Sequence, residues 1–167
     1  YQTPPHSVKT SAKFCPDCGA IMPNATINES PSSKDKRMIE VVAAVIYLGN
    51  KILCFKRGAS KFDYVSFKYE FPGGKLEAAE SPEDALKREL YEELGLFVTV
   101  GRKLTTVFHE YPDFSIHMHC YLCVTDKFNG DLTDHVEYAE VEPRDLDQLD
   151  WIEADKPIVR LLMDGDR

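Results

Sequence analysis

The sequence lacks any apolar run long enough to cross a bilayer as a helix. Such a helix needs about 20 apolar residues in succession, whereas the longest run here, residues 41–48, has the length of a buried strand. The first residues also lack the basic-then-apolar pattern of a secretory signal. We therefore expect no membrane partner.

Basic residues are also scarce. Twenty Lys and Arg stand against 28 Asp and Glu, which gives a net charge of −8. A protein that holds a nucleic-acid polymer is usually basic, because neutralised phosphates supply most of its affinity. The balance argues against such a polymer and favours an enzyme that meets a small polyanion through bound metal ions.

The cysteines are too few and too irregularly spaced for a disulfide framework. They number five, an odd count, and a reducing compartment, the cytoplasm, is the simplest expectation. Cys15 and Cys18 form half of a zinc-ribbon pattern, but residues 19–37 offer no further Cys or His. Zn²⁺ at this pair is therefore possible but not favoured, because a structural zinc ion takes four ligands. Cys120 and Cys123, three apart on an expected strand, would point to opposite faces.

The chain divides into two regions of different composition. Residues 1–37 are rich in Pro, Ser, Thr and Asn and read as an appended arm with a CxxC knuckle, whereas residues 38–167 have a globular pattern. With 167 residues in all, one compact domain is expected. The predicted strands are 40–47, 51–56, 97–110, 114–126 and 137–141, and the predicted helices are 82–94, 143–149 and 154–163. This order indicates a mixed α/β domain.

The helix 82–94 has the clearest signals. Ser81 is a good N-cap, Pro82 stands at the first helical position and Gly95 is a C-terminal stop. Leucines 86, 90 and 94 share one face. One Arg and three carboxylates lie along the edge of that buried face: Arg88, Glu89, Glu92 and Glu93. Carboxylates crowded at a buried edge need a positive partner, and Mg²⁺, which prefers hard oxygen ligands, is the natural candidate.

The residues around this helix resemble a known family. They fit the pattern G-x5-E-x7-R-E-U-x-E-E-x-G-U, where U is aliphatic, at all nine specified positions over 23 residues. The positions are Gly74, Glu80, Arg88, Glu89, Leu90, Glu92, Glu93, Gly95 and Leu96. This pattern is the Nudix box. The lead-in YEFPGGKLE at 69–77 and the tail at 149–159 resemble the MutT-like branch of that family.

The resemblance implies a fold, a reaction and a set of roles. The fold is an α/β/α sandwich with a mixed β-sheet between helices. Glu89, Glu92, Glu93 and the carbonyl of Gly73 would bind Mg²⁺, with Mn²⁺ as a possible substitute. Arg88 and Glu80 would pair to orient these carboxylates, and Lys75 and Arg57 would neutralise substrate phosphates. A further carboxylate is expected from the loop 131–137, where Asp134 aligns best and Glu137 is the fallback.

MutT-like relatives hydrolyse a nucleoside triphosphate to a monophosphate and pyrophosphate. Asp155 matches their base-reading position. An ionised Asp accepts from an amino group such as cytosine N4, whereas a protonated one could donate to an oxidised purine, so CTP-like and 8-oxo-dGTP-like substrates both stay open. Asp155 could instead cap the helix that follows it. Phe114 and His117 should border the pocket, and His117 and His119, on one face, favour packing or base contacts over a metal pair.

Two other functions stay open. The chain could hydrolyse a diphosphate conjugate such as ADP-ribose, or it could be a non-catalytic module that senses a nucleotide. The complete set of box carboxylates disfavours the sensor, which would tolerate their loss. Whether the protein is a monomer or a homodimer does not follow from its sequence.

Overall fold

The computed structural model describes residues 36–165 of the chain. The arm, and with it the Cys15–Cys18 pair and its possible Zn²⁺, lies outside the described residues apart from its last two. None of the helices within residues 36–165 is both long and apolar enough to span a membrane.

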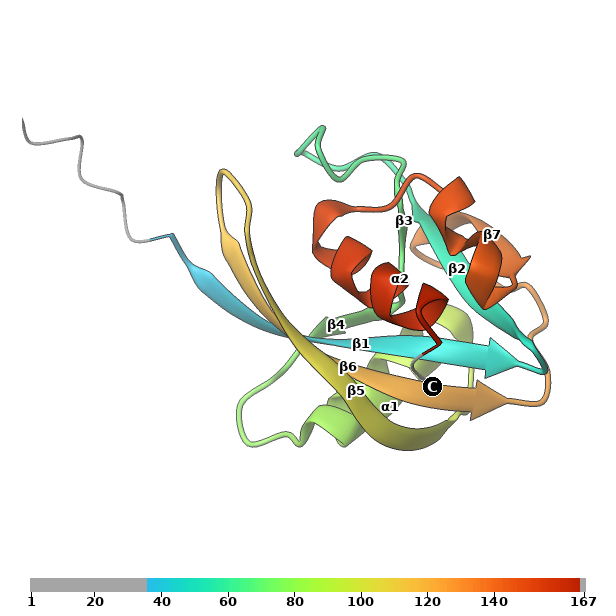
Figure 1. Ribbon diagram of the computed structural model, residues 1–167. Helices are drawn as coiled ribbons and strands as arrows, with labels where there is room; N and C mark the ends of the chain where they lie inside the picture. The colour runs from blue at the N-terminus through green and yellow to red at the C-terminus, as the bar shows by residue number, and fades with distance from the viewer. Residues whose placement is uncertain (1–35, 166–167) are drawn as a thin grey trace, which may run out of the picture. The chain divides into compact units, whose positions relative to one another are not determined.

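Seven strands form one mixed sheet in which β1 is central (Figure 1). The order is β3-β2-β1-β6-β5, with β4 also paired to β1 and β7 to β2. The pairing of β1 with β6 is parallel, and the other pairings between strands are antiparallel. The strands are β1 (Met38–Leu48), β2 (Lys51–Arg57), β3 (Tyr69–Glu70), β4 (Gly73–Lys75), β5 (Thr99–Glu110), β6 (Ser115–Thr125) and β7 (His135–Val141).

Helices cover both faces of this sheet. On one face α1 (Pro82–Leu94) packs against Val42, Ala44 and Ile46 of β1. On the other, α2 (Lys156–Met163) packs with Ala43 and Val45, beside the 3-10 helices η1 (Pro143–Gln148) and η2 (Glu153–Asp155). Because β1 is buried on both sides, its sequence is nearly all apolar rather than alternating. The expected α/β/α sandwich with a mixed sheet is confirmed.

Helix α1 begins and ends at the predicted residues. The Ser81 hydroxyl oxygen accepts a hydrogen bond from the Asp84 N–H at 3.1 Å, and Pro82 opens the helix. Gly95 ends it in the left-handed conformation, with φ of 59°, where a side chain would be strained. The cysteine expectation also holds, because Cys120 lies in the core under α2 and Cys123 in the core under α1.

The short strands β3 and β4 were not among the predicted strands. Two or three residues are too few to show a periodic pattern, and their extended form depends on β1 and β2. The close approach of β4 to β1 and to α1 requires glycine at two positions. A Cβ at Gly73 would lie 1.9 Å from the carbonyl oxygen of Val42, and one at Gly74 would lie 2.3 Å from the carboxyl carbon of Glu89. Other differences are smaller: β5 and β7 begin at Thr99 and His135, and η1 is a 3-10 helix.

Replacing Leu90 with Ala tests whether the buried face of α1 holds the domain together. Leu90 is fully buried in the core between α1 and β1, so its truncation should lower the free energy of unfolding by about 2–5 kcal/mol. Lys87, exposed on the same helix, is the matched control, and its replacement with Ala should change stability by less than about 0.5 kcal/mol. Denaturant unfolding measures both, and similar values for the two variants would contradict this packing.

Candidate active site

Arg88 organises the carboxylates of the box. Its guanidinium donates to both oxygens of Glu80, at 2.8 and 3.1 Å, and to Glu89 at 2.9 Å. A further N–H reaches the carbonyl oxygen of Lys75 at 3.2 Å, which ties α1 to β4. Glu92, 59% exposed, is contacted only at 3.4 Å. The planar guanidinium therefore fixes Glu80 and Glu89 in place while Glu92 stays near solvent.

Glu93 is the carboxylate that this network leaves without a partner. Its Oε2 is buried and has no hydrogen-bond partner among the described residues. Burial, and then the negative charges of Glu89, Glu70 and Asp134, raise the pKa of Glu93 to about 8. A buried carboxylate among others is costly unless a cation joins it. The site therefore fits the divalent ion expected from the sequence, with Glu93 and Glu89 as its buried donors.

Glu70 is a functional candidate that the sequence reasoning missed. It accepts from the Arg57 guanidinium at 2.8 Å and from Nε2 of His135 at 2.9 Å. Arg57 and Glu70 come from the adjacent strands β2 and β3, and His135 opens β7. The lead-in motif YEFPGG contained Glu70, and its place four residues before Gly74, the first residue of the box, was the available signal. His135 is buried, and its contact with Glu70 joins β7 to β3.

The loop before β7 brings Asp134 to the same place. The Thr133 N–H donates to the carbonyl oxygen of Glu93 at 3.2 Å, which anchors this loop to the end of α1. Asp134 lines the pocket beside Glu93. The fallback residue Glu137 does not line it; its carboxylate accepts from the Tyr69 hydroxyl and lies 3.9 Å from Lys56 Nζ. The geometry favours Asp134 over Glu137 as the extra carboxylate.

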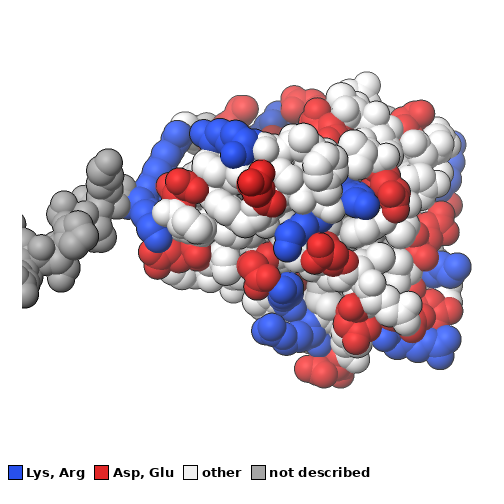
Figure 2. Space-filling model, turned by 90° about the horizontal axis from the view of Figure 1, so that it is seen from above, with Lys and Arg blue, Asp and Glu red and all other residues white. Residues whose placement is uncertain are grey.

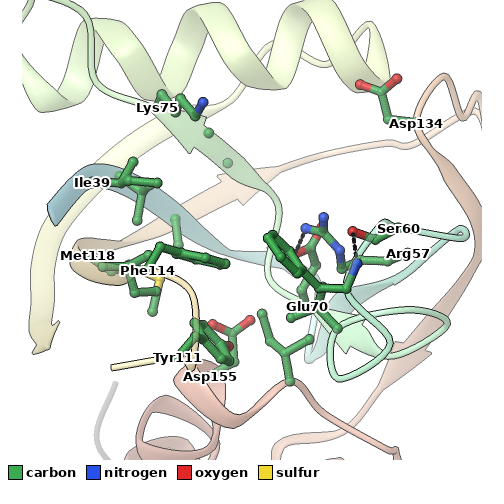
Figure 3. A pocket seen from close by; sticks show the side chains of 18 of the residues that line it. Ile39, Arg57, Ser60, Glu70, Lys75, Tyr111, Phe114, Met118, Asp134 and Asp155 are labelled. Carbon is green, nitrogen blue, oxygen red and sulfur yellow. Dashed lines mark hydrogen bonds and ion pairs between the residues drawn. The ribbon is translucent and has the colours of Figure 1, made fainter. Parts of the chain in front are cut away.

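A cleft of about 860 Å³ connects the carboxylates with the buried core under α2. Figure 3 shows Lys75 and Asp134 at the end of the cleft near α1, Arg57 and Glu70 in the middle, and Tyr111 and Asp155 at the far end. Aromatic rings of the 58–68 loop and the 111–114 turn stack along one side. The ring pairs are Phe62–Tyr64, Tyr64–Tyr111, Tyr111–Phe114 and Phe62–Phe114, with centroids 5.1–5.5 Å apart.

Asp155 lies at the deep end of the cleft. It is 1% exposed, and its Oδ2 accepts from the Phe71 N–H at 2.8 Å. Burial raises the pKa of this carboxyl well above its usual range. Although Asp155 precedes α2, its side chain makes no capping hydrogen bond there. The alternative role as a helix cap is thus wrong, and the side chain is instead held toward the cleft.

The expected placement of His117 at the pocket is wrong. On β6 the residues that line the cleft are Ile116 and Met118, whereas His117 and His119 alternate to the opposite face of the sheet. There both imidazoles contact the carboxylate of Glu40. The sequence could not decide this, because β6 carries buried residues on both faces. Phe114, Lys75, Arg57, Gly73 and Asp155 do line the cleft as expected.

The charged surface shows how the net charge is distributed. On the face in Figure 2, basic and acidic side chains are interspersed rather than gathered into one basic band. Such a face offers no track for a nucleic-acid backbone, whose binding relies on clustered positive charge.

The fold and the box together define a class of hydrolase. A mixed sheet between helices carries a loop–helix–loop in which one Arg aligns several carboxylates beside a cleft. A family model described as "NUDIX domain" matches residues 37–164. The chain therefore belongs to the Nudix family and is a Nudix hydrolase, as the box predicted. Members of this family generally use Mg²⁺ or Mn²⁺.

Three named proteins are similar to this chain. A CTP pyrophosphohydrolase of Escherichia coli is 40% identical over 129 residues, which cover 76% of this chain and 93% of that protein. An 8-oxo-dGTP diphosphatase of Proteus vulgaris is 41% identical over 88 residues, 53% of this chain and 78% of that protein. The solved structure of a MutT protein from methicillin-resistant Staphylococcus aureus is 39% identical, with a TM-score of 0.61 over 77% of this chain and 98% of that one.

Replacing Arg88 with Lys tests the role of the guanidinium. A Lys keeps the positive charge but cannot donate at once to Glu80, Glu89 and the Lys75 carbonyl. Mg²⁺ affinity should fall by roughly 10–100-fold, as expected when a residue that orients metal ligands is lost. Isothermal titration with Mg²⁺ measures this, and an unchanged affinity would mean that the carboxylates hold their positions without Arg88.

Mg²⁺ binding at pH 7 should release about one proton, because the metal-free Glu93 carboxyl, with a pKa of about 8, is mainly protonated there. Its raised pKa means that protons compete with Mg²⁺ below pH 8, so apparent affinity should rise with pH and level off above that value. Calorimetry in buffers of different ionisation enthalpy counts the proton.

The control pair for this measurement is Glu93→Gln and Glu92→Gln. The first should abolish the proton release. The second removes an exposed carboxylate and should retain it. Proton release that persists in Glu93→Gln would show that another group is the protonated one.

Proposed function

We propose that this protein hydrolyses a nucleoside triphosphate of the CTP or dCTP type to a nucleoside monophosphate and pyrophosphate, with Mg²⁺. The proposal rests on the buried Oε2 of Glu93, which has no hydrogen-bond partner within residues 36–165, at one end of a cleft whose other end is the buried Asp155. A site of this kind suits a ligand with phosphates at one end and a polar base at the other. Its volume lies in the range of small-molecule sites.

Mg²⁺ would be held by Glu89, Glu93 and Glu92, with the Gly73 carbonyl and Asp134 as further oxygen donors. When bound, such ions lower the pKa of the attacking water and neutralise phosphate charge. Mn²⁺ would fit the same oxygen donors.

Two basic residues of the chain act on the phosphates. Lys75, at the mouth of the cleft, supplies a positive charge on a flexible stem. Arg57 is held by Glu70 through one nitrogen, while its Nε is buried without a partner among the described residues. Its guanidinium is thereby oriented before substrate arrives, which lets it stabilise negative charge that develops as the phosphoanhydride bond breaks.

Asp155 would read the base. Because the Phe71 N–H occupies Oδ2, a ligand meets Oδ1. The ionised carboxylate accepts there from an exocyclic amino group such as cytosine N4. When the carboxyl is protonated, the proton sits on Oδ1 and donates to a carbonyl oxygen, as on an oxidised purine. Phe114 and Tyr111 offer aromatic faces to the base beside it.

The match to the CTP pyrophosphohydrolase covers 93% of that protein, whereas the match to the 8-oxo-dGTP diphosphatase of Proteus vulgaris covers 78%. The longer match supports the pyrimidine substrate over the oxidised purine. An ADP-ribose-like conjugate would share the carboxylates and differ at the base end. The nucleotide sensor is disfavoured, because all four carboxylates of the box are present and Arg88 holds two of them, Glu80 and Glu89, in place.

Hydrolysis should be measured with Mg²⁺, as pyrophosphate release from CTP, dCTP, UTP and 8-oxo-dGTP and as AMP formation from ADP-ribose. We expect CTP or dCTP to give the highest kcat/KM, with pyrophosphate as a product. Glu93→Gln should lower kcat by more than the roughly 10–100-fold that follows the loss of a merely supporting residue. Hydrolysis of ADP-ribose alone, or nucleotide binding without turnover, would contradict the proposal and favour the conjugate hydrolase or the sensor.

The preference for CTP over UTP should depend on pH through Asp155. CTP presents an amino group where UTP presents a carbonyl oxygen, so the ionised carboxylate favours CTP and the protonated carboxyl favours UTP. Since burial raises the pKa of Asp155, the ratio of kcat/KM for CTP to that for UTP should increase as pH rises through this pKa. Asp155→Ala should flatten the ratio; a pH-dependent ratio that survives in this variant would place base reading elsewhere.

A further inference from the structure

A cluster of side chains of metal-ligating types lies on the face of the sheet opposite the cleft. Glu40 on β1 is paired in register with His117 on the parallel strand β6, and Val42 with His119. Strand alternation therefore puts both imidazoles on one face beside the Glu40 carboxylate. Nδ1 of His117 lies 2.8 Å from Oε1 of Glu40, and Nε2 of His119 lies 2.9 Å from its Oε2.

The donor set has the composition of a transition-metal site. One ligand atom from each of Glu40, His117 and His119 can be chosen so that all three lie within 4.8 Å of one another. Imidazole nitrogen suits Zn²⁺ and its neighbours in the first transition row, whereas Mg²⁺ prefers oxygen. Three protein ligands with a fourth position for water is a recurrent arrangement for Zn²⁺.

The distances are close to those a bound ion would impose. With zinc–ligand bonds of about 2.0–2.1 Å, two ligands of a tetrahedral ion are about 3.3 Å apart. The nitrogen–oxygen contacts to Glu40, at 2.8 and 2.9 Å, would have to open by only about half an ångström. The two rings, with centroids 4.8 Å apart, are already gathered around one carboxylate. The rigid strand pairing thus supplies most of the preorganisation.

We propose that Glu40, His117 and His119 bind a divalent transition-metal ion of the zinc class, at a site separate from the carboxylates of the box. The site ties the beginning of β1 to β6. His119 is largely buried and Glu40 is partly exposed, with side-chain exposures of 17% and 45%, so an ion can enter from solvent. Metal binding here follows from the geometry of this face of the sheet and does not depend on which nucleotide the enzyme cleaves.

Lys103 opposes metal binding at His119. Its Nζ lies 2.9 Å from Nδ1 of His119. An ammonium can only donate, so Nδ1 accepts and the imidazole proton sits on Nε2, facing Glu40. For Nε2 to bind a metal, that proton must move to Nδ1 and Lys103 must turn away. A Gln at position 103 removes the positive charge and offers a carbonyl oxygen to the Nδ1–H, which is the usual support for a metal-bound imidazole.

The test is a titration of the full chain with Zn²⁺ in saturating Mg²⁺, followed by nitrogen-detected spectra of labelled imidazoles. The protein has only five histidines, so each can be followed. One equivalent should shift the His117 and His119 nitrogens and leave those of His109 and His135 unchanged. A parallel titration of the Cys15→Ser, Cys18→Ser double variant distinguishes Zn²⁺ binding at this site from Zn²⁺ binding by those two thiolates.

Affinity is then measured calorimetrically in matched variants. Glu40→Gln and His119→Gln should each weaken Zn²⁺ binding at least tenfold, whereas His109→Gln on the neighbouring strand β5 should not. Lys103→Gln should strengthen it several-fold. The melting temperature should rise by roughly 5–10 °C at a hundredfold excess over Kd in the wild type, and by less in Glu40→Gln.

The proposal would be overturned if the imidazole resonances of His117 and His119 did not respond to Zn²⁺ at about 1 mM, a concentration at which even a weak site binds. The cluster would then be a hydrogen-bonded pair of histidines on one carboxylate. Binding that is unchanged in Glu40→Gln and His119→Gln would equally overturn it, by placing the ion elsewhere. A loss of affinity in Lys103→Gln would contradict coordination through Nε2 of His119.

Discussion

The concentration of negative charge around Glu93 is the constraint on which the rest of the site depends. These carboxylates come from three parts of the chain: Glu89 and Glu93 from α1, Glu70 from β3 and Asp134 from the loop before β7. Burial, and then the negative charge of the other three carboxylates, raises the pKa of Glu93. Two guanidinium groups offset part of this charge. Arg88 holds the carboxylates on its side of α1, and Arg57 holds Glu70 on β3. The buried Oε2 of Glu93 is left without a hydrogen-bonding partner among the described residues. A divalent cation can bind there.

The fold is arranged so that this cluster is rigid. The central strand β1 packs on helices on both faces, and β4 is added to it at Gly73 and Gly74, where any side chain would collide with β1 or with Glu89. The Lys75 carbonyl then accepts from Arg88, and the end of α1 accepts from the loop that carries Asp134. The backbone segments that carry Glu89, Glu93 and Asp134 are thus held to one another by hydrogen bonds, and catalysis by positioned charges requires such fixed positions.

Much of this arrangement could be predicted from the sequence, because its signals are local. The caps of α1, its leucine stripe and the spacing of the box lie within one short segment, and the structure has them as expected. Glu70 was missed because its role depends on two partners that are distant in sequence, Arg57 and His135. The His117 error has a similar origin: both faces of β6 are buried, so periodicity alone could not tell which face meets the cleft. For Asp155, two local roles fitted equally well, and only its contact with Phe71 separates them.

The central claim is that one cleft holds metal ions at Glu93 and a pyrimidine base at Asp155. A crystal structure with Mn²⁺ and a non-hydrolysable CTP analogue tests it most directly, since manganese is visible by anomalous scattering. We expect an anomalous peak between Glu93 and Glu89, phosphates beside Arg57 and Lys75, and the cytosine amino group at Oδ1 of Asp155. A peak away from Glu93, or a base bound outside the cleft with Asp155 contacting only Phe71, would contradict it.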